Sequence, residues 1–361
     1  MVELSIIVPT YKEIDNIADV VKHVHVCLEG VAWELIFVDD DSPDGTADRV
    51  REIARTDPHV RCLQRIGRRG LSSACIEGML SSSAPYVAVM DADLQHDETL
   101  LPTMLNILRQ GDTDIVIGSR YTPGGEVGQW DKSRAWISRL ATRLSHLVLK
   151  ADLADPMSGF FMMTHDAMIR CMKGNISSIG FKILLDLFAS SPRPLRFKEL
   201  PYYFRERQAG ESKLDAMVAW EYILLLLDKL IGHIVPIRFV AFSLIGGVGV
   251  LVHLLALTIV YHTMSMPFVT GQTIATLMAM TSNFFLNNFL TYHDMRLRGW
   301  GLLCGWISFM LACSVGAIAN VGIATYLFEM QTFWIISAVA GILVGAVWNY
   351  AATAFYTWRK R

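Results

Sequence analysis

The C-terminal third of the chain is almost free of charged residues. Asp, Glu, Lys and Arg are absent from residues 239–293, 299–328 and 331–358. A helix that crosses a membrane needs about 20 mostly apolar residues, so the first stretch is long enough for two helices and each of the others for one. We therefore expect four membrane spans, at about residues 239–261, 268–291, 302–328 and 333–357. Four such stretches exceed what the core of a soluble protein of 361 residues needs.

The chain has no surplus of basic residues. Its formal net charge is −2, which argues against nucleic acid as a partner. Residues 234–361 contain six basic and two acidic residues, so this part carries about +4 and the remainder about −6. Its basic residues are Arg238, Arg296, Arg298 and the tail 359–361, whereas the turns at 262–267 and 329–332 have none. The positive-inside rule then predicts that the N-terminal domain, the middle loop and the C-terminus are cytoplasmic.

Two further patterns are absent. None of the six cysteines has the C-x-x-C spacing, and a cytoplasmic domain would keep its thiols reduced, so we expect them to be small apolar core residues. The N-terminus lacks the basic-then-apolar pattern of a secretion signal, because its apolar run at residues 4–8 has only the length of a strand.

Residues 1–215 alternate between strand-like and helix-like segments. Short β-branched or apolar runs occur at residues 4–8, 34–38, 60–63, 86–90 and 114–117. Helical patterns lie between them, near residues 14–28, 45–56, 71–83 and 98–110. This alternation predicts an α/β fold with a mostly parallel sheet covered by helices on both faces. Beyond Gly118 the pattern is less regular.

The hexapeptide DADLQH at residues 91–96 follows the apolar run 86–90. The carboxylates of Asp91 and Asp93 and the amide oxygen of Gln95 form an oxygen-rich group that suits a hard divalent cation. At the carboxyl end of a parallel strand, such a group lies where open α/β sheets bind ligands. A cation held there can neutralise a diphosphate, so the motif indicates a nucleotide-sugar enzyme, although a bare D-x-D triplet is common.

Two more polar segments follow predicted strands and are expected at the same edge of the sheet. The segment PTYKE at residues 9–13 offers Tyr11, whose ring can pack on a base. The segment DDDSPDGT at residues 39–46 offers carboxylates that accept from base N–H groups or ribose hydroxyls. Ser, Pro, Asp and Gly also favour turns and helix caps. We therefore expect the turn to shape the loop while Asp40 faces the ligand.

Cationic side chains downstream suit phosphate groups. Arg120 ends the fifth predicted strand, and Arg134 and Ser138 lie one helical turn apart on one helix face. Arg207 and Lys213 occupy a Gly-containing loop that could fold over a diphosphate, with bidentate contacts from Arg and a point charge from Lys. The spacing alone fits contacts with anionic lipid equally well.

Residues 216–235 are strongly apolar but include charged and aromatic side chains. This composition predicts an amphipathic helix that lies on the membrane surface. The alternative is a helix packed on the N-terminal domain.

The polar segments together resemble one known family. The set PTYKE, VDDDSPDGT, MDADLQH, GSRY, DPMSGF and FxxRxxGxSK, in this order and spacing, resembles dolichyl-phosphate mannose synthases, which are inverting glycosyltransferases of family 2 with the GT-A fold. The resemblance covers roughly residues 3–215. Residues 236–361 are similar to the GtrA-like four-helix membrane domain of some prokaryotic synthases. The implied domains are a GT-A domain at 1–215, an interfacial helix at 216–235 and a transmembrane domain at 236–361.

The resemblance also implies roles for individual residues. The guanosine of GDP-mannose would be held by Pro9, Tyr11, Glu13, Val38 and Asp40. A Mg²⁺ or Mn²⁺ ion and the diphosphate would be surrounded by Asp91, Ala92, Asp93 and Gln95, with Asp93 and Gln95 as the direct metal ligands. The donor diphosphate would also contact Lys182, Arg207 and Lys213. The acceptor phosphate would face Arg120, Arg134 and Ser138. The residues closest to the chemistry would be Asp91, Asp93 and Arg120.

The implied reaction transfers mannose from GDP-mannose to dolichyl or polyprenyl phosphate with inversion. The acceptor phosphate is already an anion and needs no general base. Two alternatives remain open: the same reaction with a UDP-sugar such as UDP-glucose, and a fused synthase whose membrane half moves the lipid-linked sugar across the bilayer.

Polar and small residues within the predicted spans need an explanation of their own. Asparagines 283, 287, 288 and 320 are costly among membrane lipids unless they pair across helices. We expect them to pack helices rather than line a lipid path. Likewise, we expect Gly246, Gly247 and Gly249 to allow close helix packing.

Overall fold

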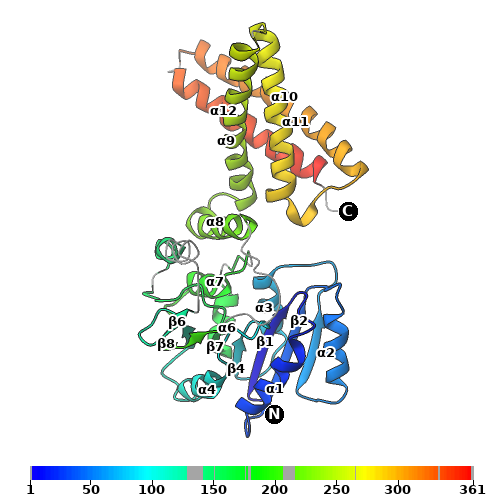
Figure 1. The fold of residues 1–361 in the computed structure, drawn as a ribbon. Helices are drawn as coiled ribbons and strands as arrows, with labels where there is room; N and C mark the ends of the chain where they lie inside the picture. Colours follow the sequence, from blue (N-terminus) through cyan, green and yellow to red (C-terminus); the bar gives the residue numbers. More distant parts are fainter. Residues whose placement is uncertain are drawn as a thin grey trace. The chain divides into compact units, whose positions relative to one another are not determined.

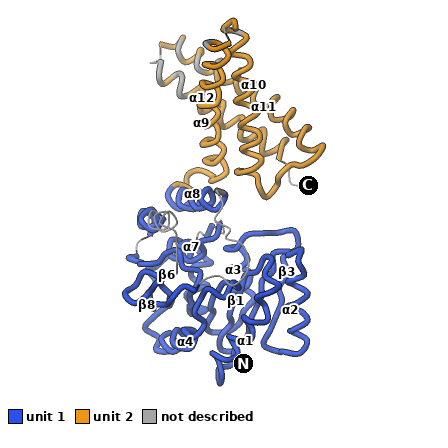
Figure 2. The backbone as a smooth tube through the Cα atoms, viewed as in Figure 1, with its two compact units in different colours: residues 1–230 blue, residues 231–361 orange. Residues whose placement is uncertain are grey.

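The computed structural model describes residues 2–127, 141–149, 151–174, 176–177, 180–205, 216–264, 266–331 and 334–358. The chain forms two compact units, residues 1–230 and residues 231–361, which are described separately (Figure 2). The division falls within the segment 216–235 that the sequence sets apart, because most of helix α8 (Ala216–Ile231) belongs to the first unit.

The first unit is built on a seven-stranded sheet with the order β3-β2-β1-β4-β7-β5-β8 (Figure 1). The strands are β1 (Leu4–Thr10), β2 (Trp33–Asp39), β3 (Val60–Gln64), β4 (Tyr86–Val89), β5 (Ile115–Ser119), β7 (Phe161–Thr164) and β8 (Phe197–Pro201). All neighbours are parallel except β7, which is antiparallel to β4 and β5. Two short parallel strands, β6 (Glu126–Val127) and β9 (Tyr203–Phe204), form a second sheet. The predicted α/β fold with a mostly parallel sheet is confirmed.

Helices cover both faces of the large sheet. One face packs against α1 (Ile17–Cys27), α2 (Thr46–Ala54) and α4 (Leu101–Arg109). The other packs against α3 (Leu71–Leu80), α6 (His165–Met172), α7 (Ile183–Ser190) and α8. Successive side chains of a strand point to opposite faces of the sheet. In β1, Ile6 and Val8 therefore pack against the face covered by α1, α2 and α4, and Ile7 packs against the opposite face. A parallel strand covered on both sides is apolar throughout, and all seven residues of β1 are buried.

Helix α8 packs on the first unit. Leu225 and Leu226 are buried in its core, and the ammonium of Lys229 lies 2.6 Å from a carboxylate oxygen of Asp186, a fully buried residue of α7. This arrangement is the alternative that the sequence left open. The predicted location of the helix at the membrane surface stays a prediction.

The second unit contains four long helices: α9 (Ile237–Thr258), α10 (Phe268–Leu286), α11 (Trp300–Glu329) and α12 (Trp334–Ala352). They coincide with the four stretches that the sequence marks as spans. Within the described residues, Ile237–Tyr261 and Trp300–Leu327 are long and apolar enough to cross a membrane by length and composition. The count of four spans stays a prediction.

The two helical hairpins of this unit repeat each other. Asn283 and Asn349 are each the sixteenth residue of their helix, α10 and α12, and each is followed at the same spacing by a π-helical turn (Asn287–Thr291 and Thr353–Thr357). The residue after each turn is aromatic, and these two equivalent rings, Tyr292 and Trp358, stack with centroids 4.2 Å apart and planes 5° apart. Equivalent positions of the two hairpins therefore meet where the hairpins join.

Small and amide residues provide the helix packing. A Cβ added to Gly249 would collide with Asn283, and one added to Gly316 would collide with Asn349. Close packing is thus confirmed for Gly249, whereas a Cβ on Gly246 or Gly247 would meet nothing within 4 Å.

Asn288 also serves packing. Its buried side chain accepts from the Leu297 amide at 2.8 Å and from the Trp358 indole at 3.0 Å. The role expected for the intramembrane asparagines is therefore observed for this residue.

Candidate active site

The carboxyl ends of β2, β1 and β4 are neighbours in the sheet. Pro9 of β1 is the register partner of Val38 of β2, so two of the predicted guanosine residues lie side by side. Each loop after these strands contains a non-glycine residue in the left-handed region: Lys12 (φ 59°), Asp41 (φ 56°) and Leu94 (φ 59°). Such conformations are uncommon and costly, and they gather at functional sites. This edge of the sheet is therefore the candidate site.

The turn after β4 holds the oxygen atoms expected to bind a cation. Asp93 and Gln95 are buried, with 6% and 9% of their surface exposed, and Ala92 is buried between the acids. The backbone N–H of Gln95 donates to Asp93 Oδ1 at 3.2 Å. The amide nitrogen of Gln95 donates to the carbonyl of Arg205 at 2.9 Å, which leaves the amide oxygen as the atom that could bind a cation. Their assignment as metal ligands stays a prediction.

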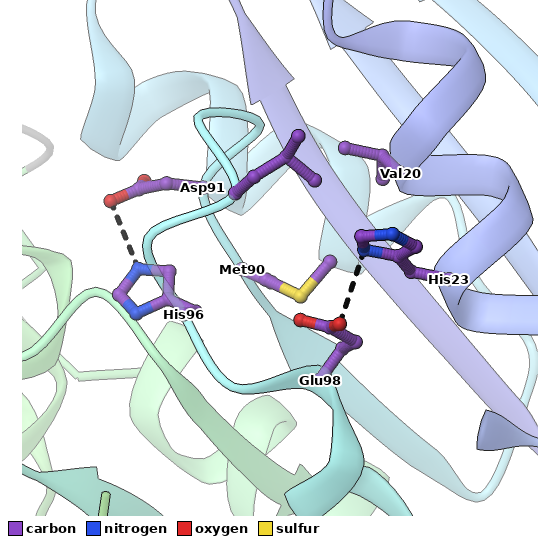
Figure 3. Close-up of a pocket in the computed structure, with 7 residues that line it drawn as sticks. Val20, His23, Met90, Asp91, His96 and Glu98 are labelled. Carbon is purple, nitrogen blue, oxygen red and sulfur yellow. Dashed lines mark hydrogen bonds and ion pairs between the residues drawn. The ribbon is translucent and has the colours of Figure 1, made fainter. Parts of the chain in front are cut away.

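Asp91 is oriented by a buried histidine. His96 Nε2 lies 3.1 Å from Asp91 Oδ2 (Figure 3), and His96 Nδ1 lies 3.0 Å from the Tyr202 hydroxyl. Burial raises the pKa of Tyr202 above its ordinary value, so the phenol keeps its proton and can donate a hydrogen bond to His96 Nδ1. Gly159 approaches Asp91 so closely that a Cβ there would lie 2.9 Å from the carboxylate, which explains a glycine in the DPMSGF segment.

A small pocket lies beside Asp91 and His96. Its other lining residues are Val20, His23, Met90, Leu94 and Glu98. His23 and Glu98 meet at 3.1 Å on the side opposite Asp91 (Figure 3). Asp91 belongs to the predicted donor site, whereas the predicted guanosine residues Tyr11 and Asp40 do not line this pocket.

Asp40 is bonded to the chain itself. Its Oδ1 accepts from the Arg65 guanidinium at 2.7 Å and its Oδ2 from the Gly70 amide at 2.7 Å. Burial raises the pKa of the Asp40 carboxyl, and the Gly70 amide and Arg65 oppose that rise. Asp40 therefore shapes the 65–70 loop in this structure. Its predicted contact with guanosine stays a prediction, and it would require these bonds to be shared or exchanged.

The turn at residues 41–46 has the geometry that its residue types predict. The Ser42 hydroxyl donates to Asp39 Oδ1 at 2.6 Å, and the Thr46 hydroxyl donates to Asp44 Oδ1 at 2.7 Å. Gly45, at φ 91°, precedes the first residue of α2. Glycine adopts this left-handed conformation without the steric penalty that other residues have.

The ring of Tyr11 lies beside a cation. The Arg69 guanidinium carbon is 4.3 Å from the centre of its ring, a distance typical of a cation–π contact. The predicted stacking of this ring on a base stays a prediction. Glu13 helps to hold the loop in place, because its backbone N–H donates to the Thr46 hydroxyl at 3.1 Å and its carboxylate accepts from Asn16 at 2.8 Å.

Arg120 forms a bidentate ion pair with Asp155. The Nε and Nη2 atoms donate to the two carboxylate oxygens at 2.7 and 2.8 Å, and the Arg120 backbone N–H donates to the same carboxylate at 3.1 Å. Asp155 is fully buried and the Arg120 side chain is 10% exposed. Although burial opposes the charge, Asp155 holds the pKa of Arg120 above its ordinary value. Arg120 therefore has a fixed partner in Asp155, and its contact with the acceptor phosphate stays a prediction.

Lys182 is half-buried and immediately precedes α7. Burial, together with the charge of Arg120, lowers its pKa to about 8, while Asp155 and Asp91 act in the opposite direction. These four groups are distant in sequence, and the structure brings them into one electrostatic environment. Four further predicted site residues, Arg134, Ser138, Arg207 and Lys213, lie outside the described residues.

Four side chains of the site were not predicted from the sequence: Arg65, Arg69, His96 and Arg205. Arg205 pairs with Glu98 at 2.8 Å and Asp97 at 3.1 Å and so fixes the segment that carries Gln95. Signals were present for His96, which lies within the DADLQH motif, and for Arg65, which directly follows β3 and so lies at the carboxyl edge of the sheet. Arg69 and Arg205 belong to loops whose local sequence does not indicate which strand end they approach.

Comparisons with known proteins assign both units. Residues 5–171 match the family described as glycosyl transferase family 2, and residues 241–358 match the family described as GtrA/DPMS, transmembrane domain. A dolichol-phosphate mannosyltransferase of Pyrococcus furiosus is 32% identical over 361 residues, which cover 99% of this chain and 99% of the relative. The chain belongs to the dolichol-phosphate mannosyltransferase family. It is therefore a glycosyltransferase and a membrane protein, as the sequence motifs predict.

Two other similarities cover only part of the chain. An undecaprenyl-phosphate mannosyltransferase of Micrococcus luteus is 32% identical over 221 residues, which cover 60% of this chain and 89% of the relative. The crystal structure of glucosyl-3-phosphoglycerate synthase from Mycobacterium tuberculosis is 18% identical, with a TM-score of 0.47 and coverage of 63% of this chain and 79% of that one.

Proposed function

We propose that the chain transfers mannose from GDP-mannose to the phosphate of a dolichyl or other polyprenyl lipid, with inversion, at the cytoplasmic face of the membrane. One observation carries the proposal. The ends of β2, β1 and β4 gather the carboxylates of the DADLQH turn and the paired Pro9 and Val38 at one edge, in a chain that also contains a GtrA/DPMS transmembrane domain. The names of the relatives, which act on dolichol and undecaprenyl phosphates, support the acceptor class.

The residues present fit a divalent cation. Asp93 and Gln95 are buried and fixed by backbone contacts, while the Asp91 side chain is 35% exposed and aligned by His96. Carboxylate and amide oxygens are the ligands of Mg²⁺ and Mn²⁺. We assign Asp93, Gln95 and Asp91 to hold such an ion, which would stabilise negative charge on the departing diphosphate.

The chain's own residues supply positioning and charge. Asp40, Tyr11 and Glu13 would hold the guanosine, and Lys182 would contact the donor diphosphate. Arg120, whose guanidinium plane Asp155 fixes, would contact the acceptor phosphate, because a guanidinium has five N–H donors. A reacting oxygen held in line gains rate by proximity. A single displacement by a phosphate anion would invert the anomeric centre without a general base.

The metal assignment is tested with matched substitutions. Asp93→Asn should lower the formation of lipid-linked mannose by roughly 100-fold, the order expected when one preorganised electrostatic contact is lost. Asp112→Asn is the control, because Asp112 is exposed and precedes β5, at the opposite edge of the sheet. Equal activity of the two variants would refute the assigned role.

The donor is tested by binding. Purified full-length protein in detergent should bind GDP more tightly than UDP in the presence of Mg²⁺. Tighter binding of UDP would favour a UDP-sugar donor instead. The anomeric configuration of the product, determined by NMR, tests inversion: an α-linked product from an α-linked donor would exclude a single displacement.

A further inference from the structure

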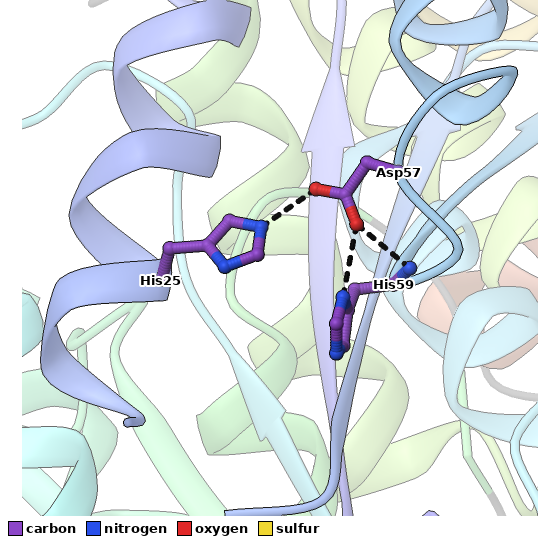
Figure 4. A group of neighbouring side chains, drawn as sticks. All are labelled: His25, Asp57 and His59. Atoms are coloured by element: carbon purple, nitrogen blue, oxygen red, sulfur yellow. Dashed lines mark hydrogen bonds and ion pairs between the residues drawn. The ribbon is translucent and has the colours of Figure 1, made fainter. Parts of the chain in front are cut away.

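Two histidines converge on one carboxylate at the amino edge of the large sheet. His25 Nε2 lies 2.6 Å from Asp57 Oδ2, and His59 Nδ1 lies 2.9 Å from Asp57 Oδ1 (Figure 4). His25 is in the last turn of α1, whereas Asp57 and His59 belong to the turn between α2 and β3. Among the described residues, these three side chains offer ligand atoms that all lie within 4.8 Å of one another.

The cluster is held in place by its surroundings. The ring of His59 stacks on Trp33 with centroids 4.5 Å apart, and the rings of His25 and Trp33 form a T-shaped pair with centroids 4.7 Å apart. Asp57 accepts from the His59 backbone N–H at 3.0 Å and its side chain is 16% exposed. The histidine side chains are 43% and 40% exposed, so an ion could reach them from solvent. The carboxylate is thus fixed, while the two rings are accessible.

We propose that His25, Asp57 and His59 form a binding site for a divalent transition-metal ion of the zinc type. Two imidazole nitrogens and one carboxylate oxygen are a ligand set that Zn²⁺ uses, with a water in the fourth position. Imidazole ligands favour Zn²⁺, Ni²⁺ and Cu²⁺ over Mg²⁺ and Mn²⁺, which prefer oxygen ligands. The ring nitrogens that face Asp57 carry the protons shared with the carboxylate, because a carboxylate only accepts. Metal binding therefore moves the proton of each neutral imidazole to its other ring nitrogen, and no group changes its oxidation state.

The geometry requires only a small movement. Ligands at about 2.1 Å from a tetrahedral ion lie roughly 3.4 Å apart, somewhat further than the 2.6 and 2.9 Å that now separate the ring nitrogens from Asp57. Rings that are two-fifths exposed can turn outward by that amount. The bound ion would join the end of α1 to the turn before β3.

This site is separate from the proposed catalytic metal site. Trp33 begins β2 and Asp39, six residues further along, ends it, and a strand rises about 3.3 Å per residue. The two edges are therefore roughly 20 Å apart. The proposed role is structural, and it does not depend on the identity of the sugar donor.

The test uses the full-length protein in detergent, without a histidine tag and with excess Mg²⁺, and Zn²⁺ alone as the probe. Isothermal titration should show one saturable Zn²⁺ site. His25→Gln, which leaves the His59–Trp33 stack in place, should lower the Zn²⁺ affinity of this site by at least roughly ten-fold. Asp57→Asn, a variant of the same size, should do the same. His146→Gln is the control, because His146 is exposed and lies outside the cluster.

A spectroscopic readout is independent of activity. Ni²⁺ or Cu²⁺ should quench the fluorescence of Trp33, and this quenching should disappear in His25→Gln and in Trp33→Phe. Transfer activity with Mg²⁺ should be unchanged in His25→Gln. Equal Zn²⁺ affinity of the wild type, His25→Gln and Asp57→Asn would overturn the proposal, as would quenching by Ni²⁺ that persists in Trp33→Phe.

Discussion

Removal of the Arg120 guanidinium should destabilise the first unit strongly. Arg120→Met would leave the Asp155 carboxylate, which is fully buried, without the two side-chain donors at 2.7 and 2.8 Å. Breaking a buried ion pair by removing one partner costs about 3–5 kcal/mol. The Arg120 backbone N–H still donates to Asp155, so we expect a value near the lower end, about 3 kcal/mol.

This cost is measurable by thermal unfolding of the purified chain. For a domain of this size, 1 kcal/mol corresponds to a shift in Tm of roughly 2–4 °C, so Arg120→Met should unfold roughly 6–12 °C below the wild type. In the double variant Arg120→Met/Asp155→Asn, the buried charge is also removed. That variant should recover most of the loss, because replacing both members of a buried ion pair is often close to neutral.

The double variant then separates stability from function. If Arg120 binds the acceptor phosphate, the double variant is folded but has a raised KM for polyprenyl phosphate, while the KM for the donor changes little. A single variant that unfolds within about 2 °C of the wild type would refute the assigned energetic role of the pair. A stable double variant with full activity would refute the acceptor role.

Three further perturbations give separate expectations. Burial lowers the pKa of Lys182 to about 8, so the donor KM should rise as pH increases through 8. A flat pH profile of this KM would contradict the assignment. The unfolded chain binds the Lys182 proton more tightly, so the free energy of unfolding should rise between pH 8 and the ordinary lysine pKa of 10.5. Lys229→Met removes the ammonium that lies 2.6 Å from the buried Asp186 carboxylate and should cost about 3 kcal/mol in chemical unfolding; an unchanged midpoint would show that α8 is not held this way. Gly249→Ala should lower Tm through a clash worth about 1–3 kcal/mol, whereas Gly247→Ala, where a Cβ meets nothing, should not.

Local patterns in the sequence determined the fold class and the position of the DADLQH turn. The five predicted strands correspond to β1–β5, because an apolar run of five residues bounded by polar turns has few alternatives in a buried parallel sheet. The same physics places DADLQH at the end of β4. Hydropathy likewise located α9 to α12, because each corresponds to a long apolar stretch without charged residues.

Contacts between distant segments were decided only by the tertiary structure. Asp40 meets Arg65, 25 residues away, and Arg120 meets Asp155, 35 residues away. No periodic pattern in the sequence indicates such an ion pair. The pairing depends on which two loops lie at the same edge of the sheet and on which charged groups are buried together.

Helix α8 and the two repeated hairpins give further examples of contacts that the sequence alone did not decide. Leu225, Leu226 and Lys229 could face lipid or protein by sequence alone, and the buried Asp186 carboxylate decided in favour of contact with the first unit. The matching positions of Asn283 and Asn349 are present in the sequence, but their equivalence became evident only when each asparagine was seen to face a glycine of the preceding helix. Short-range chemistry along a chain determines which elements form, whereas the partners of its buried polar groups depend on the packing of those elements in three dimensions.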